Sequence, residues 1–147
     1  MENQKVVESL KTVLINSYSL YLKTQNYHWN VVGANFKSLH ELFEQQYQDL
    51  QDAVDLLAER IRALGDFVPA TLNEYNAQKI IADGNRNYNS NEMLKDLVDS
   101  QDTIISLLKD LIKVAEENND AGTADMATLR IEIHQKNRWM LDSSIVR

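Results

Sequence analysis

Apolar side chains recur at every third or fourth position through most of this chain, with polar residues between them. Such spacing places the apolar residues on one side of an α-helix. It predicts long helices at residues 4–30, from about 36–38 to 64, about 91–118 and about 121–144. No stretch of useful length alternates polar and apolar residues as a strand does, so the pattern predicts an all-α protein.

Turn and capping residues mark the ends of these helices. Gly33 and Asn35 separate the first from the second, because glycine adopts positive φ at low cost. Ser38 with Glu41 fits a capping box for the second helix, and Asn35 is an equally good N-cap one turn earlier. Gly65 is placed where a C′ glycine ends that helix.

Residues 66–90 lose the helical pattern and contain Pro69, Gly84 and many asparagines. A connection of this length is typical of a crossover, and residues 71–79 are expected to form a short helix within it. The predicted fold is an all-α, ferritin-like four-helix bundle whose long crossover, with its short helix, joins helices two and three. On the fourth helix we place five residues on or near the inner face: Ala124, Leu129, Ile133, Met140 and Leu141.

The 147 residues fit one domain, residues 1–147, and contain no cysteine. The lack of cysteine excludes disulfides and thiolate metal sites and suits a reducing compartment. There is no signal-peptide pattern and no apolar stretch of the roughly 20 residues that span a bilayer. We therefore expect a cytoplasmic protein with no membrane partner.

The formal net charge is -7 and the sequence pI is about 4.9. An acidic surface repels phosphate backbones unless a basic patch is set apart on it. Two interpretations stay open, namely ordinary solubility and a surface that gathers cations.

The candidate functional groups are histidine imidazoles and carboxylates, since no phosphate-binding glycine loop or cysteine nucleophile is present. Such ligands suit iron, manganese or zinc. Di-iron bundles carry Glu-x-x-His motifs on two helices. Three positions before the three histidines stand Gln25, Lys37 and Ile131, so the usual site inside one bundle is disfavoured.

The second predicted helix carries His40, Glu44, Asp55 and Glu59 on one face. At about 100° per residue, and with His40 at zero, the other three lie near 40°, 60° and 100°. His40 and Asp55 are nevertheless roughly 22 Å apart along the axis. One chain therefore cannot bring both pairs of ligands to one ion.

The pairs His40–Glu59 and Glu44–Asp55 share one midpoint, between Asp49 and Leu50. Two copies of the helix crossing antiparallel about a two-fold axis there would bring each His40 close to a partner's Glu59. The antiparallel first helix returns His28 toward the His40 end. We infer two identical sites per dimer, with His28, His40 and, as a further candidate, Glu44 from one chain, and with Asp55 and Glu59 from the other.

Simpler interpretations exist for each residue taken alone. A single histidine on a helix is more often a surface or satisfied side chain than a ligand. Carboxylates four residues apart are often a solvated face, and Arg60 and Arg62 are available here as their partners. The shared face and midpoint are what favour a metal site.

Several motifs match one known family: Asn26-Tyr27-His28-Trp29-Asn30-Val31, Gly33, Phe36, Leu39-His40, Phe43-Glu44, Asp55, Ala58-Glu59-Arg60-Ile61, Leu64-Gly65 and, near the end, His134-Gln135-Lys136 with Trp139-Met140-Leu141. Over essentially its whole length the chain resembles the Dps-type miniferritins, the dodecameric relatives of ferritin. The resemblance implies a shell of twelve subunits with iron sites at two-fold interfaces. It assigns His28 and His40 to one subunit and Asp55 and Glu59 to its mate, with Glu44 where a further acidic ligand usually stands.

The implied reaction is oxidation of Fe(II), preferentially by hydrogen peroxide, with storage of the ferric mineral in the cavity. This use of peroxide limits hydroxyl-radical formation. Trp29 adjoins the site in the family, where it packs and intercepts oxidising equivalents; a core aromatic is the other interpretation. Asp120 and Asp125 fall where the family lines its iron-entry pores, although Asp120 fits the N-cap of the fourth helix equally well.

Three further expectations follow. His134 is remote from the ligands and is placed on a helix surface. Many family members compact DNA through a lysine-rich tail, but here the first helix is expected to start within residues 1–5, so direct DNA binding is not expected. The alternatives are a nucleoid-associated, DNA-protecting shell with secondary iron activity and a metal-free helical adaptor.

Overall fold

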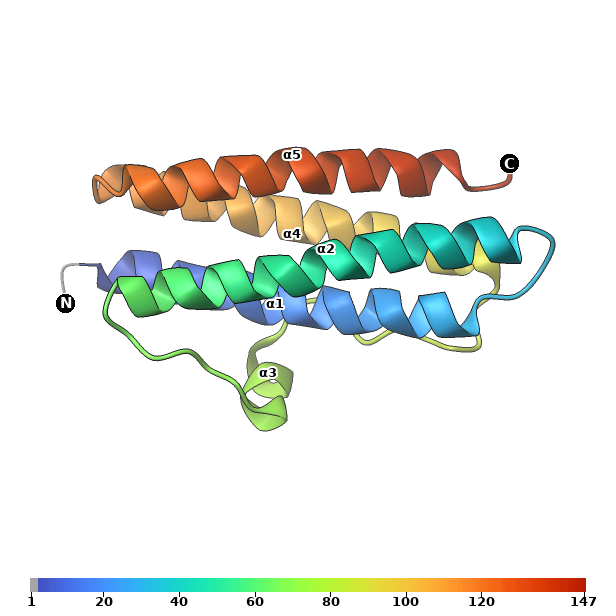
Figure 1. Cartoon of the computed structure of the whole chain (residues 1–147), viewed down its shortest axis with the longest axis horizontal. Helices are drawn as coiled ribbons and strands as arrows, with labels where there is room; N and C mark the ends of the chain where they lie inside the picture. The colour runs from blue at the N-terminus through green and yellow to red at the C-terminus, as the bar shows by residue number, and fades with distance from the viewer. Residues whose placement is uncertain (1–2) are drawn as a thin grey trace.

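A computed structural model describes residues 3–147, which form five helices and no strand. The helices are α1 (Gln4–Asn30), α2 (Phe36–Ala63), α3 (Leu72–Gln78), α4 (Ser90–Glu117) and α5 (Ala121–Ser143). The four long helices lie side by side as a bundle, and the short α3 stands outside it against α1 (Figure 1). The predicted all-α bundle, with a short helix in its crossover, is confirmed. Within residues 3–147, no helix is both long and apolar enough to cross a membrane.

The chain direction explains the long crossover. Helices α1 and α2 form one antiparallel pair, and α4 and α5 form the other (Figure 1). Helix α2 ends at the opposite end of the bundle from the start of α4 (Figure 1). The connecting segment therefore has to travel the length of the bundle, and α3 lies on the way.

Two glycines that the sequence indicated lie at helix ends, and N-cap side chains that were not predicted begin α3 and α4. Gly33 and Gly65 have φ of +116° and +99°, in the region that favours glycine. Thr71 caps α3 and Asn89 caps α4, each by accepting a hydrogen bond from a backbone N–H. The capping box predicted at Ser38 is wrong, because Asn35 is the N-cap residue of α2 and the Ser38 hydroxyl donates to its carbonyl oxygen.

The inner face of α5 differs from the prediction. Leu129 is 61% exposed and Ile133 36% exposed, whereas Ala124 and Leu141 are buried as expected. The other buried residues of α5 are small or polar: Thr123, Ala127, Arg130 and His134. An apolar pattern marks this face only in part, because most of its buried positions carry small or polar side chains.

His134 is buried, with 1% of its surface exposed, so its predicted place on the helix surface is wrong. Its Nδ1–H donates to Gln101 Oε1 at 2.7 Å, and Arg130 donates to its Nε2 at 3.0 Å. Arg130 in turn makes two hydrogen bonds of 2.9 Å to the Asp49 carboxylate. Burial, reinforced by the Arg130 charge, lowers the pKa of His134 to about 3. This polar chain links α2, α4 and α5 inside the bundle.

Candidate metal centre

His28 and His40 lie face to face where α1 ends and α2 begins. Their rings are stacked with centroids 3.8 Å apart and planes 15° from parallel. The Nδ1 of each ring is 2.7 Å from the backbone carbonyl oxygen of the other histidine. The short turn around Gly33 brings the two helix ends close enough for this reciprocal pair.

These hydrogen bonds fix the tautomer of both rings. A carbonyl oxygen only accepts, so each Nδ1 must carry the proton. In the neutral ring, each Nε2 is then left with a free lone pair, the form in which histidine binds metals. The Nε2 of His28 is 3.9 Å from Glu44 Oε1. The free lone pair of His28 is therefore near a carboxylate, and the His40 ring is stacked beside it.

Two further aromatic rings hold the histidine pair in position. Phe36 stacks on His40 with centroids 5.1 Å apart, and Tyr47 meets His28 edge to face at 5.2 Å. Packing of this kind restricts ring rotation. The sequence pattern gave Tyr47 no part in the predicted site. Its position, seven residues after His40, put it on the same face of the helix and could have indicated it.

Asp55 and Glu59 lie toward the other end of α2 and are exposed. The simpler interpretation, that Arg60 and Arg62 pair with them, is wrong. Arg60 donates to Asp120 and Thr123, and Arg62 donates to the Asp66 carbonyl and lies 4.4 Å over the Phe67 ring. Both carboxylates are without an ion-pair partner among residues 3–147.

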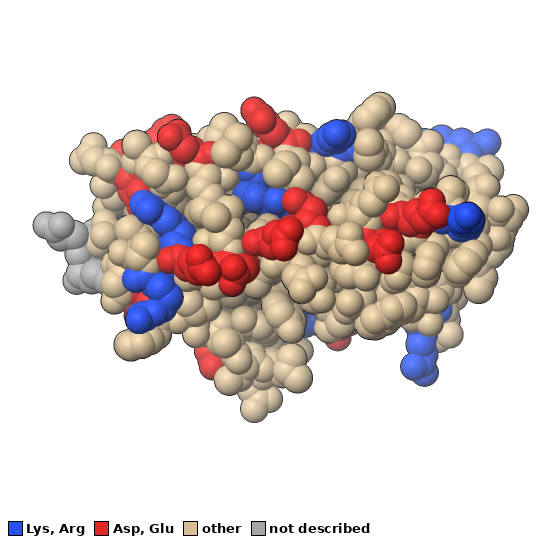
Figure 2. Space-filling model, in the orientation of Figure 1, with Lys and Arg blue, Asp and Glu red and all other residues tan. Residues whose placement is uncertain are grey.

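Acidic side chains form a row along α2 on one face of the molecule (Figure 2). Within residues 3–147, no group of three or more histidine, aspartate or glutamate side chains is arranged to hold a metal ion. The single chain thus presents the histidines with Glu44 at one end of α2 and the Asp55–Glu59 pair at the other. The two groups of predicted ligands are therefore separate on one chain, as the helical spacing predicts.

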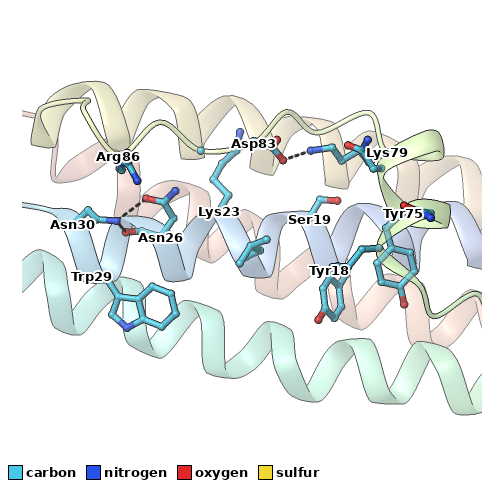
Figure 3. A pocket seen from close by; sticks show the side chains of 15 residues that line it. Tyr18, Ser19, Lys23, Asn26, Trp29, Asn30, Tyr75, Lys79, Asp83 and Arg86 are labelled. Carbon is cyan, nitrogen blue, oxygen red and sulfur yellow. Dashed lines mark hydrogen bonds and ion pairs between the residues drawn. The ribbon is translucent and has the colours of Figure 1, made fainter.

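Trp29 is next to His28 in sequence but faces elsewhere. It is 61% exposed and lines a groove between α1 and the crossover (Figure 3). In this chain it is therefore not a core aromatic.

Asp120 is the N-cap of α5, and its carboxylate accepts hydrogen bonds from both the N–H and the hydroxyl of Thr123. Arg60 reaches the same carboxylate at 2.8 Å. Burial by itself raises the pKa of Asp120, but the Thr123 hydrogen bonds and the Arg60 charge outweigh it and lower the pKa below its ordinary value. The capping interpretation is confirmed. Asp125, one turn further, is exposed.

Comparison with known proteins places this chain in a family. The sequence model of the ferritin-like domain matches residues 7–147. The DNA protection during starvation protein of Brevibacillus brevis is 34% identical over 95% of this chain and 94% of its own length.

Solved structures indicate the same family as the sequence comparisons. Dps from Staphylococcus aureus superposes with a TM-score of 0.94 at 33% identity, covering 98% of this chain and 97% of its own. The Dps protein from Vibrio cholerae O1 superposes with a TM-score of 0.93 at 31% identity, covering 97% of this chain and 89% of its own. It is described as a member of a broad superfamily of ferritin-like diiron-carboxylate proteins. The chain belongs to the Dps family of ferritin-like proteins.

Proposed function

We propose that this protein is a ferroxidase and iron store whose sites are shared between two-fold related chains of a dodecameric shell. The observation that carries the proposal is the reciprocal hydrogen bonding of His28 and His40, which leaves both Nε2 atoms free, that of His28 at 3.9 Å from Glu44 Oε1. Asp55 and Glu59 of a second chain would complete each site. The family supports an iron substrate, since the Vibrio cholerae relative is described as diiron-carboxylate.

The chemistry follows from the ligand set. Imidazole and carboxylate groups bind Fe(II) as substrate, and carboxylates stabilise the more highly charged Fe(III) product. Two Fe(II) ions and one hydrogen peroxide, with two protons, yield two Fe(III) ions and two water molecules. Peroxide accepts both electrons at one site, so free hydroxyl radical is avoided. The ferric product collects in the shell, and the cell is protected from oxidative damage.

A DNA-coating role is the alternative suggested by the relatives named for DNA protection. The net charge of -7 opposes it, because binding to the phosphate backbone relies on clustered Lys and Arg. Removal of Fe(II) and peroxide would protect DNA without contact. We therefore favour the iron chemistry as the primary function.

The test is the rate of Fe(II) loss after hydrogen peroxide is added anaerobically. We expect the Asp55→Ala, Glu59→Ala double variant to be slower by about tenfold or more, because half of every site loses its ligands. The matched control is Asp110→Ala, Glu117→Ala, which removes the same charge from exposed positions on α4 and should keep the original rate. Equal rates in the two double variants would refute the site assignment.

A further inference from the structure

Arg130 of α5 is a buried cation inside the bundle, with only 5% of its surface exposed. Its Nη1 donates to Asp49 Oδ1 at 2.9 Å. Its Nη2 donates to Asp49 Oδ2 at 2.9 Å and to His134 Nε2 at 3.0 Å. The Nη2 nitrogen is therefore in contact with a carboxylate oxygen of α2 and an imidazole lone pair of α5 at the same time. Carboxylate and imidazole are also the ligands of the proposed metal centre.

The histidine of this group is oriented in the way that a metal ligand is. Arginine only donates, so His134 Nε2 accepts, and the proton is on Nδ1, which donates to Gln101 Oε1 at 2.7 Å. Metal-binding histidines almost always donate their second N–H to such a partner, which fixes the ring. Gln101 is itself fully buried. The lone pair of His134 thus faces Arg130 in the position where, in a metal site, it would face the ion.

The surroundings of this group are polar as well. Gln46 lies one turn before Asp49 on α2, is 3% exposed and donates through Nε2 to the Asn137 carbonyl oxygen. Among residues 3–147, the buried side-chain atoms without a hydrogen-bond partner are Gln46 Oε1, Gln101 Nε2 and Asn137 Nδ2. All three residues are within one turn of Asp49 or His134, or are hydrogen-bonded to His134. This part of the bundle therefore has groups that can hydrogen-bond to water molecules bound to an ion.

The charge of Arg130 decides what these side chains can bind. Its guanidinium balances the Asp49 carboxylate, and His134, which accepts through Nε2, adds no charge. Without the guanidinium, a carboxylate that is 31% exposed would remain beside a free imidazole lone pair. Such ligands favour divalent ions of the Fe(II), Co(II) or Zn(II) class. Because the ligand distances of Zn(II), for example, are about 2.0–2.2 Å, the two side chains would each move inward by about 1 Å.

We propose that Arg130 occupies a latent metal site between α2, α4 and α5, and that its guanidinium takes the place of a divalent transition-metal ion. The ligands of this site are Asp49 and His134, and Gln101 orients the imidazole. Asp49 follows His40 by nine residues, which places it on the opposite side of α2 from the proposed iron ligands. By satisfying both ligands and excluding cations, Arg130 keeps Fe(II) out of the bundle interior. This second site does not depend on iron oxidation at the first.

Binding of Co(II) to the metal-free assembled particle tests the proposal, with the bound ions counted per chain and followed by their visible absorption. Arg130→Ala should bind one Co(II) per chain more than the unaltered particle. Arg138→Ala is the matched control, because it removes an arginine that pairs with Asp102 on the outside of the same helix, and it should bind no additional ion. Adding His134→Gln to Arg130→Ala should abolish the additional ion. Because the count is relative to the unaltered particle, a failure of the proposed ferroxidase would not alter it.

Arg130→Glu is a second variant that keeps the test decisive. It places a carboxylate one turn before His134, on the same face of α5, and so adds a third ligand. Its affinity for Co(II) should be severalfold higher than that of Arg130→Ala, and Co(II) should raise its Tm more than that of Arg138→Glu. If Arg130→Ala does not assemble, rescue of Arg130→Glu by Co(II), lost when His134→Gln is added, would support the site. An unchanged Co(II) count in both Arg130 variants, or no rescue, would overturn it.

Discussion

Two of the three histidines show how differently the same side chain is used in this protein. His28 donates through Nδ1 to a backbone carbonyl and keeps Nε2 free. His134 has both nitrogens engaged, one by Gln101 and the other by Arg130. A histidine with a free lone pair beside a carboxylate is ready to bind a metal, whereas one enclosed on both sides serves to join helices.

The buried state of His134 makes a prediction about acid stability. The unfolded chain takes up a proton near the ordinary pKa of 6.5, whereas the folded chain resists protonation until a pKa of about 3. The unfolded state binds more protons between these values, so stability falls as pH falls through that window. The slope from this residue is at most about 1.4 kcal/mol per pH unit.

Urea unfolding at several pH values checks this expectation. The His134→Gln variant has no titrating group at this position, and its free energy of unfolding should fall less steeply between about pH 6.5 and pH 3.5. The variant will be less stable overall because the Gln101 and Arg130 contacts change, so the slope is the relevant quantity. Identical slopes for both proteins would contradict the prediction.

At the scale of elements, α2 sets the distance between the two groups of predicted ligands. Its C-terminal end is hydrogen-bonded to the start of α5. Arg60 reaches from α2 to Asp120 and Thr123 at the start of α5. The room for this guanidinium depends on Gly122, where a Cβ would lie 3.1 Å from Arg60 Nη2. Glu59, the proposed ligand, precedes Arg60 in sequence, so this contact also positions the Asp55–Glu59 end of the helix.

Asp120 is expected to matter for stability through this contact. Asp120→Ala removes both the N-cap and the partner of Arg60, which should cost about 1–3 kcal/mol. Asp120→Asn keeps a capping side chain and loses only the charge, so its cost should be smaller. Thermal unfolding measures both. Asp125→Ala, at an exposed position one turn on, is the control, and a Tm as low as that of Asp120→Ala would contradict this account.

At the scale of the whole molecule, the proposed site exists only where two chains meet. The ligands lie toward opposite ends of one helix, and a two-fold axis repeats each contact. Assembly and chemistry are therefore coupled.

Mixed particles test the sharing of ligands directly. A His28→Ala, His40→Ala variant and an Asp55→Ala, Glu59→Ala variant should each be inactive alone. When the two variants are co-expressed and pair at random, about a quarter of the sites take their histidines from the carboxylate variant and their carboxylates from the histidine variant. Only these sites have all their ligands. Peroxide-driven Fe(II) loss should return to about that fraction. Separately assembled particles mixed afterwards are the control, and an inactive co-expressed particle would show that each site lies within one chain.

The sequence by itself determined the elements. Helix periodicity, capping residues and glycines act over a few neighbouring positions, so the long helices and the short helix at Leu72–Gln78 were predicted nearly to the residue. The same periodicity put His40, Glu44, Asp55 and Glu59 on one face of α2. These features needed no knowledge of what packs against them.

Only the tertiary structure decided the roles that depend on distant partners. Arg130 is 81 residues from Asp49, and His134 is 33 from Gln101, so nothing local indicated that these polar groups are buried. The partner of Arg60 and the ring beside His28 likewise come from contacts between helices. Which polar group is satisfied inside and which stays free for chemistry is set by packing, since burial is acceptable only where a hydrogen-bond partner is present.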